Sequence, residues 1–218
     1  MLNKEVHVIV LGRNYADEIS AIRALGVAGC TVDLIASVQN KDGASVSAAS
    51  KYVHKTVELV HKMGKEDQDE AAAELVEELL KHKNLNGPKP VIFPTDDYTV
   101  SVVDHHRSEL EPYFLLPSIV GGGDGSMVHL MNKTVQAQMA QTAGLSVPRE
   151  WTFDLSEEIV VPADMVFPCI CKRMDSETGY ESEMAVCEDE AEFLEHMNRL
   201  RRRSADRMTL VQEFLHVD

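Results

Sequence analysis

Near its start the chain reads Val6-His7-Val8-Ile9-Val10-Leu11-Gly12, a β-branched apolar run that ends at a glycine. This pattern predicts a buried strand followed by a turn. Apolar residues then recur at helical spacing from Ile19 to Ala28, and Gly29 is placed to cap the helix. Thr31 to Ile35 alternates as a second strand. A strand, a helix and a strand in this order form a βαβ unit, which predicts a parallel sheet.

The alternation of strands and helices continues over roughly the first 118 residues. An amphipathic helix carries Ala72 to Leu80 and ends near Asn86-Gly87-Pro88, and a third strand, Val91 to Phe93, follows it. A helix through Leu110 then leads to a short strand, Phe114 to Leu116. This order predicts a doubly wound α/β layer.

A glycine-rich stretch, Gly121-Gly122-Gly123-Asp124-Gly125, interrupts this pattern and is typical of a connector. It lacks the Lys-Ser/Thr ending of a P-loop, so we favour a linker over a phosphate cradle. We therefore expect two domains, residues 1–120 and residues 126–218.

The second half has a different order of elements. Asn132 is placed to cap a helix that Gly144 ends, and an extended segment follows to Phe153. The remaining expected elements are the strands 166–172, 185–187 and 208–215 and the helix 189–202. This order predicts an α+β domain, with an antiparallel sheet and a helix packed on it.

Composition excludes several classes of protein. The 218 residues are 44% hydrophobic and 26% charged, which is enough apolar material for a core. The net charge of −15 would repel a phosphate backbone, so nucleic acid is not an expected partner. The run that ends at Leu11 is too short for a membrane span or a signal-peptide core. We expect a cytoplasmic protein without a membrane partner.

The four cysteines, Cys30, Cys169, Cys171 and Cys187, have no paired Cys-x-x-Cys spacing. Buried thiols are the expected state. A zinc site that combined them with His105 and His106 would need ligands far apart in sequence, so no metal ligand is assigned within the chain.

A dinucleotide-binding function is disfavoured at the end of the first strand. The residues after Gly12 are Arg13, Asn14 and Tyr15, without the second and third glycines of the fingerprint. An oxidoreductase domain is therefore the weakest of three hypotheses. Gly12 is interpreted as a tight turn or part of a substrate-binding loop.

Two lysines and a late strand are more informative. Lys133 lies in the first turn of its helix, where the unpaired backbone N–H groups favour an anion. Lys172 ends an apolar strand, on the face opposite Cys169 and Cys171, and needs a counter-charge. The alternating segment 211–215 offers an adenine both a backbone edge and an apolar wall.

In their order and spacing these features resemble the ATP-grasp superfamily over nearly the whole chain. The resemblance rests on five stretches: 8–12, 50–53, 93–97, 131–133 and 143–148. It implies a Rossmann-like pre-ATP-grasp domain followed by a partial ATP-grasp module. It also implies that Lys133 and Lys172 hold the phosphates of ATP. The adenine would be held by Gln212, Glu213, Phe214 and Leu215, with Glu213 accepting from the amino group.

The resemblance is strongest to carbamoyl-phosphate-synthase-like and carboxylate-amine ligases, which form an acyl phosphate that an amine, or in some ligases a thiol, attacks. It implies a carboxylate substrate near Gly12, Arg13, Asn14, Thr95 and Asp96, with Arg13 as the anion contact. No catalytic residue is assigned, and a homodimer is left open.

Two departures from the family pattern lead to further expectations. The segment 173–181 has one glycine and several acids where the family has a glycine-rich phosphate cover. The family's magnesium ligands would lie beyond Asp218, so we expect this chain alone to be inactive. The alternative is a non-catalytic module that binds a nucleotide or another small molecule.

Overall fold

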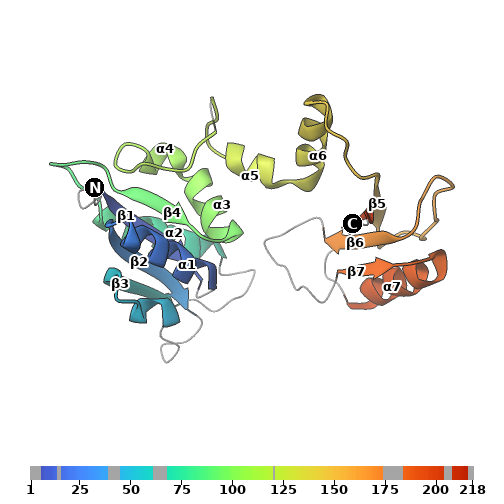
Figure 1. The fold of residues 1–218 in the computed structure, drawn as a ribbon, viewed down its shortest axis with the longest axis horizontal. Coiled ribbons are helices and arrows are strands. Elements are labelled where there is room, and N and C mark those ends of the chain that lie inside the picture. The colour runs from blue at the N-terminus through green and yellow to red at the C-terminus, as the bar shows by residue number, and fades with distance from the viewer. Residues whose placement is uncertain are drawn as a thin grey trace. The chain divides into compact units, whose positions relative to one another are not determined.

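The computed structural model describes residues 6–13, 16–38, 45–60, 68–119, 121–173, 184–203 and 208–215. The chain divides into two compact units, Met1–His129 and Leu130–Asp218. Each unit contains its own sheet (Figure 1). The two units are described separately below.

The first unit has a sheet with helices on both faces. Its strands are β1 (His7–Gly12), β2 (Thr31–Val38), β3 (Val53–Val60) and β4 (Val91–Pro94). Its helices are α1 (Ala16–Val27), the 3-10 helix η1 (Val46–Ala49), α2 (Gln68–Lys81), α3 (Asp97–His105), α4 (Arg107–Leu110) and α5 (Ser126–Met131), the last of which extends across the boundary between the units. The sheet order is β3-β2-β1-β4, and every pairing is parallel. The predicted α/β fold class is confirmed.

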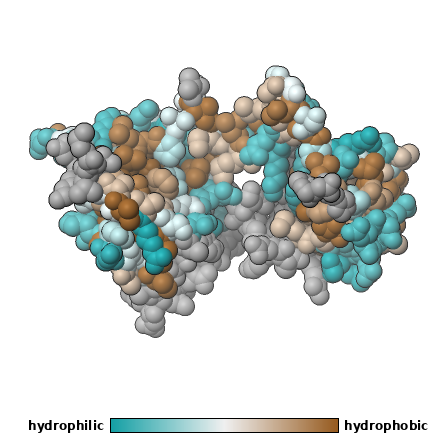
Figure 2. Space-filling view, viewed as in Figure 1, coloured by the Kyte–Doolittle hydropathy of each residue, from teal (hydrophilic) through white to brown (hydrophobic). Residues whose placement is uncertain are grey.

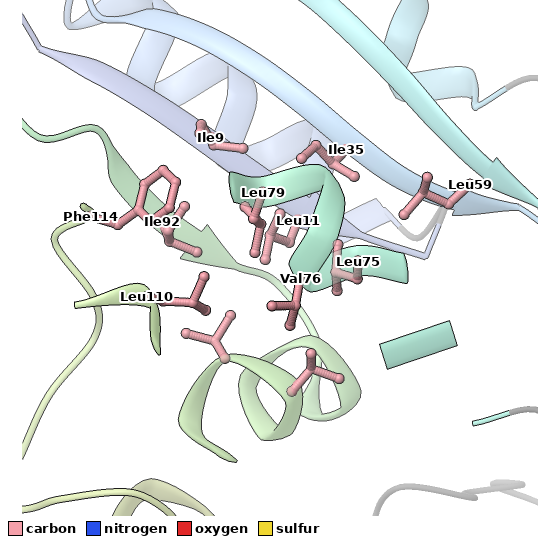
Figure 3. Close-up of a cluster of buried hydrophobic side chains, with 12 residues drawn as sticks. Ile9, Leu11, Ile35, Leu59, Leu75, Val76, Leu79, Ile92, Leu110 and Phe114 are labelled. Atoms are coloured by element: carbon pink, nitrogen blue, oxygen red, sulfur yellow. The ribbon is translucent and has the colours of Figure 1, made fainter. Parts of the chain in front are cut away.

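Alternate residues of β1 supply two different cores. Ile9 and Leu11 pack in a cluster with Leu75 and Leu79 of α2 (Figure 3). Val8 and Val10 belong to a second cluster, which also contains Ile22 of α1. Because successive side chains of a strand point to opposite faces, one apolar run serves both layers. These β1 residues are at most 2% exposed, as expected for a central parallel strand.

Two predictions for this sheet were wrong. The strand β3, Val53–Val60, was missed, so Val91–Pro94 is the fourth strand of the chain and not the third. Polar residues such as His54 and Lys55 occupy this edge strand, and most of its side chains are partly or fully exposed. The expected strand 114–116 reduces to one isolated parallel bridge between Val91 and Leu115.

The second unit is an antiparallel sheet with one long helix. Its elements are α6 (Lys133–Thr142), β5 (Glu150–Asp154), β6 (Cys169–Arg173), β7 (Ala185–Cys187), α7 (Glu190–Arg203) and β8 (Met208–Glu213). The strand order is β5-β8-β6-β7, with each neighbouring pair antiparallel. The expected α+β arrangement is confirmed.

The termini of these elements follow from local chemistry. The side chain of Asn132 accepts hydrogen bonds from the backbone N–H groups of Thr134 and Val135, which caps α6 as predicted. Gly144 follows that helix with φ at +78°, a conformation that favours glycine. The strand β6 was expected to begin at residue 166, but it begins at Cys169. The residue before it is Pro168, which has no backbone N–H to donate to a neighbouring strand.

The helix α7 covers one face of its sheet. Phe193, Met197 and Leu200 are buried in a cluster with Cys169, Val211 and other residues of the strands. The ring of Phe193 lies 5.3 Å from that of Phe153. In the space-filling view the surface around α7 is mainly hydrophilic (Figure 2), because the helix directs its charged residues outward.

Within the described ranges, no helix combines the length and the hydropathy that a membrane crossing requires.

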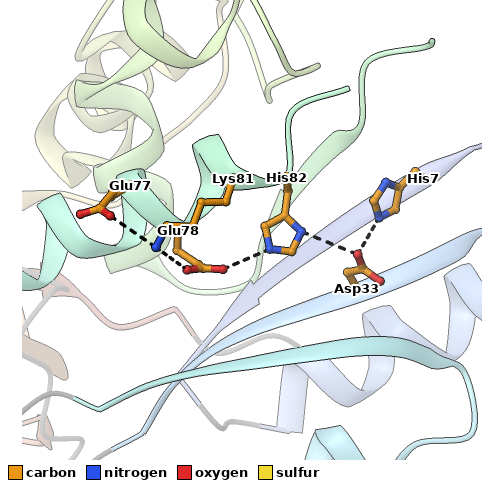
Figure 4. Close-up of polar contacts among 6 residues, drawn as sticks. All are labelled: His7, Asp33, Glu77, Glu78, Lys81 and His82. Atoms are coloured by element: carbon orange, nitrogen blue, oxygen red, sulfur yellow. Dashed lines mark hydrogen bonds and ion pairs between the residues drawn. The ribbon is translucent and has the colours of Figure 1, made fainter. Parts of the chain in front are cut away.

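A buried carboxylate joins three strands and a helix of the first unit. Asp33 of β2 is 5% exposed, and its oxygens lie 2.9 Å from Nε2 of His7 and 3.0 Å from Nδ1 of His54. His82, after α2, places its Nδ1 3.8 Å from the same carboxylate and its Nε2 3.3 Å from Glu78 (Figure 4). Burial raises the pKa of Asp33, but hydrogen bonds from His7 and His54 outweigh it and leave the pKa below its usual value.

We predict that Asp33→Asn lowers the free energy of unfolding by about 1–3 kcal/mol at pH 7, because hydrogen bonds to a charged group are lost. A lowered folded-state pKa stabilises the protein above the unfolded pKa of aspartate, about 3.9, and this contribution is lost as the pH falls through the folded value. The difference in unfolding free energy between wild type and Asp33→Asn should therefore become smaller below about pH 4. Urea unfolding between pH 7 and pH 3 measures it.

The control is Glu111→Gln, which neutralises an exposed carboxylate of the same unit. It should leave the unfolding free energy nearly unchanged. A wild-type advantage over Asp33→Asn that stays constant down to pH 3 would contradict the role given to the Asp33 charge.

Candidate functional site

The carboxyl ends of β1 and β4 bring the predicted substrate residues of the first unit together. Leu11 pairs with Pro94 in the sheet, so Gly12 and Thr95 follow at adjacent strand ends. The backbone N–H and the hydroxyl of Thr95 both donate to the carbonyl of Leu11, at 3.0 and 2.8 Å. Asn14 lies outside the described residues.

Arg13 and Asp96 form an ion pair at this edge. Arg13 Nε lies 3.2 Å from Asp96 Oδ1, and the two side chains are 16% and 11% exposed. The guanidinium also lies over the ring of Tyr98, 5.2 Å from its centroid. The structure thus holds Arg13 between a carboxylate and an aromatic ring, which fixes its orientation.

Asp96 has a structural task as well. It is the N-cap of α3, and its Oδ1 accepts from the backbone N–H of Thr99 at 3.1 Å. Asp96, which follows β4, therefore caps the next helix of the chain. Burial raises the pKa of Asp96, while the bond from Thr99 and the charge of Arg13 act in the opposite direction.

An open pocket of about 350 Å³ lies beside this edge. Its walls are formed by Asp17, Ala21, Phe93, Pro94, Thr95, Asp96, Asp97 and Val100. Thr95 and Asp96 are therefore the two predicted substrate residues that line it. Three carboxylates are among the walls, so the pocket suits a cationic or hydrogen-bond-donating group better than a bare anion.

Glu18 is a feature of this edge that sequence reasoning missed. It lies in the first turns of α1, is fully buried, and accepts a hydrogen bond from the hydroxyl of Ser45 at 3.0 Å. A Cβ at Gly12 would collide with the Glu18 carboxylate as it is placed, so the glycine allows the close approach of that side chain. An acid in the first turn of a helix is common, so the sequence alone does not single it out.

We predict that Asp96→Ala costs about 1–2 kcal/mol of stability, because the cap of α3 is lost. Asp96→Asn should cost less, because an asparagine oxygen still caps the helix while the charge facing Arg13 is removed. Urea unfolding of the two variants beside wild type measures both values. Equal costs for alanine and asparagine would show that the cap contributes nothing.

In the second unit, the two predicted phosphate lysines lie close enough to affect each other. Burial lowers the pKa of Lys172, and the positive charge of Lys133 lowers it further, while Glu150 acts in the opposite direction. Lys133 is the first residue of α6, where backbone N–H groups point away from the helix. The charges of Lys133 and Glu150 therefore both act on Lys172, in opposite directions.

Lys172 is held by a chain of hydrogen bonds across three strands. Its Nζ donates to Oε1 of Gln212 at 2.6 Å, and Nε2 of Gln212 donates to Oε1 of Glu150. Glu150 was not predicted, although the alternation of polar residues with Trp151 and Phe153 was a usable signal. The counter-charge expected for Lys172 is thus the carboxylate of Glu150, which is linked to Lys172 through the side-chain amide of Gln212.

The residues of the predicted adenine segment divide between the faces of the sheet. Gln212 lies on the face of Lys172, whereas Glu213 pairs with Cys169 and therefore lies on the other face. The Glu213 carboxylate accepts from the backbone N–H of Arg149 at 3.3 Å. The N–H of Phe214 donates to the carbonyl of Pro168 at 3.0 Å, and Leu215 is 56% exposed.

Most of the segment 173–181, which departs from the family's glycine-rich phosphate cover, lies outside the described residues.

Comparison with family models and with curated proteins found no match. Solved structures do match over nearly the whole chain. An L-amino acid ligase from Bacillus licheniformis matches with a TM-score of 0.62 and 13% identity, covering 98% of this chain and 45% of the ligase. A biotin carboxylase domain from Hydrogenobacter thermophilus, in complex with MgADP and bicarbonate, has a TM-score of 0.57 and 14% identity, covering 97% of this chain and 45% of that one.

A D-alanine–D-alanine ligase from Bacillus anthracis also matches, with a TM-score of 0.51 and 12% identity, covering 97% of this chain and 58% of the ligase. The chain thus spans about half the length of the structures that it matches. At these identities the likeness concerns the fold. The chain has the fold of the ATP-grasp ligases, over about half of their length.

Proposed function

We propose that this chain is the nucleotide-binding part of an ATP-dependent ligase that joins a carboxylate to an amine or a thiol through an acyl phosphate. The observation that carries the proposal is Lys172, which is partly buried and donates from Nζ to Gln212, and whose pKa is lowered by burial and by the charge of Lys133. ATP-grasp structures with bound MgADP share this fold, which supports a nucleotide as the ligand.

The lysines bind the phosphates of ATP in this proposal. Like charges repel, and the lowered pKa of Lys172 reports that its charged form is disfavoured in the free protein. A polyphosphate placed between the two ammonium groups would relieve both the repulsion and the desolvation. The dipole of α6 favours an anion near the same N-terminus, where Asn132 already caps the N–H groups of Thr134 and Val135.

The hydrogen-bond chain to Glu150 positions Lys172 for this task. Because Gln212 engages Lys172 Nζ at 2.6 Å, the ammonium is held in one orientation instead of sampling several rotamers. In this proposal the adenine lies at the carboxyl end of β8, beside the residues Gln212 to Leu215. Magnesium would neutralise phosphate charge in such a reaction, and no magnesium ligand is assigned to the described residues.

The carboxylate substrate is assigned to Arg13 at the strand ends of the first unit, and the acidic pocket beside it suits the amine. Gly12, Arg13, Thr95 and Asp96 lie there, and we retain Asn14, which lies outside the described residues, as a proposed substrate contact. Arg13 is suited to bidentate recognition of a carboxylate, and its pairing with Asp96 would have to be shared with the substrate. We also propose a cytoplasmic location, and a homodimer as the assembly to test.

We predict that the chain binds Mg-ATP and that Lys172→Ala weakens binding at least tenfold, which corresponds to about 1.4 kcal/mol. Lys133→Ala should weaken it by a similar factor, because both ammonium groups face the phosphates. Isothermal titration calorimetry of the intact chain measures both dissociation constants.

The control is Arg201→Ala, which removes an exposed cation from α7 in the same unit. It should leave the ATP affinity within about twofold of wild type. Binding that is unchanged in both lysine variants would overturn the phosphate assignment. Binding of a nicotinamide dinucleotide in preference to ATP would favour the oxidoreductase hypothesis instead.

A further inference from the structure

Three thiols meet on the face of the second sheet that α7 covers. Cys169 and Cys171 lie on β6, and Cys187 lies on β7, directly across from Cys169. Their sulfur atoms all lie within 4.8 Å of one another. The three residues are 0%, 0% and 2% exposed, so the expectation of buried thiols is confirmed for them.

The separation fits a single ion bound by three sulfurs. Metal–sulfur bonds of about 2.3 Å place the ligands of a trigonal site roughly 4 Å apart. The observed sulfurs therefore need only small side-chain rotations to reach a shared centre. The sequence argued against a zinc site that combined the cysteines with His105 and His106, because those ligands are far apart along the chain. The pairing of β6 with β7 brings three cysteines together without the histidines.

The chemistry of the cluster selects a soft ion. Every ligand atom in it is sulfur, and soft thiolate ligands favour Cu(I) or Zn(II) over hard ions such as magnesium and calcium. The surroundings are apolar, with Phe153, Phe193 and Met197 in the same buried cluster, so water is a poor source of a further ligand. Structural zinc is almost always four-coordinate, whereas Cu(I) is satisfied by three sulfurs.

The three sulfur atoms are already in close contact, and an ion bound at this place would displace the thiol protons.

We propose that Cys169, Cys171 and Cys187 form a binding site for one Cu(I) ion. The site is distinct from the proposed nucleotide region, because Lys172 lies on the opposite face of β6. Bound Cu(I) joins β6 to β7 and stabilises this side of the second unit. The inference does not depend on the proposed function.

The test is an anaerobic titration of the reduced, intact chain against a chromogenic Cu(I) chelator. Wild type should withdraw one equivalent of Cu(I) from the chelator. Cys171→Ser and Cys187→Ser should each weaken that binding at least tenfold. Cys30→Ser is the matched control, because Cys30 is a half-buried thiol of the first unit, and it should behave as wild type.

X-ray absorption on the wild-type complex gives a second measurement that does not depend on whether the serine variants fold. Three sulfur neighbours around copper support the site, and nitrogen or oxygen neighbours overturn it. Retention of full affinity in folded Cys171→Ser and Cys187→Ser, checked by circular dichroism, would also overturn it. So would tighter binding of Zn(II) than of Cu(I) in a parallel competition.

Discussion

The burial of β1 on both faces is the constraint on which the first unit depends. Ile9 and Leu11 complete the core beneath α2 and α3, while Val8 and Val10 complete the core beneath α1. A strand buried in this way lies in the interior of the sheet, and β2 and β4 pair on either side of it. A polar residue at any of these four positions would disturb one of the two layers.

The placement of the polar groups follows from this arrangement. Parallel strands end at the same edge, so Gly12 and Thr95 become neighbours although they are far apart along the chain. Arg13 and Asp96 then pair, and Asp96 starts α3. The same sheet buries the charge of Asp33. Contacts with histidines on the neighbouring strands offset the free-energy cost of removing that charge from water.

In the second unit, the side chains of β6 alternate between the two faces of the sheet, so its cysteines and its lysine make separate sets of contacts. Cys169 and Cys171 face α7 and the apolar cluster, whereas Lys172, the residue after Cys171, faces Gln212. The strand order is β5-β8-β6-β7. On one face, the contacts of Lys172 therefore continue across β8 to Glu150 of β5, and on the other face Cys169 lies beside Cys187 of β7. One short strand thus supports both the proposed phosphate site and the proposed copper site.

The sequence by itself determined the fold class, the caps at Asn132 and Gly144, and the opposite faces of Lys172 and the cysteines, because these follow from local periodicity and turn chemistry. It did not reveal β3, whose polar residues reflect an edge position that only the assembled sheet defines. Only the tertiary structure decided which distant groups meet: Glu150 with Gln212, Glu18 with Gly12, and Cys187 with Cys169. Such contacts depend on strand pairing and helix packing between segments far apart in the chain, which local patterns do not encode.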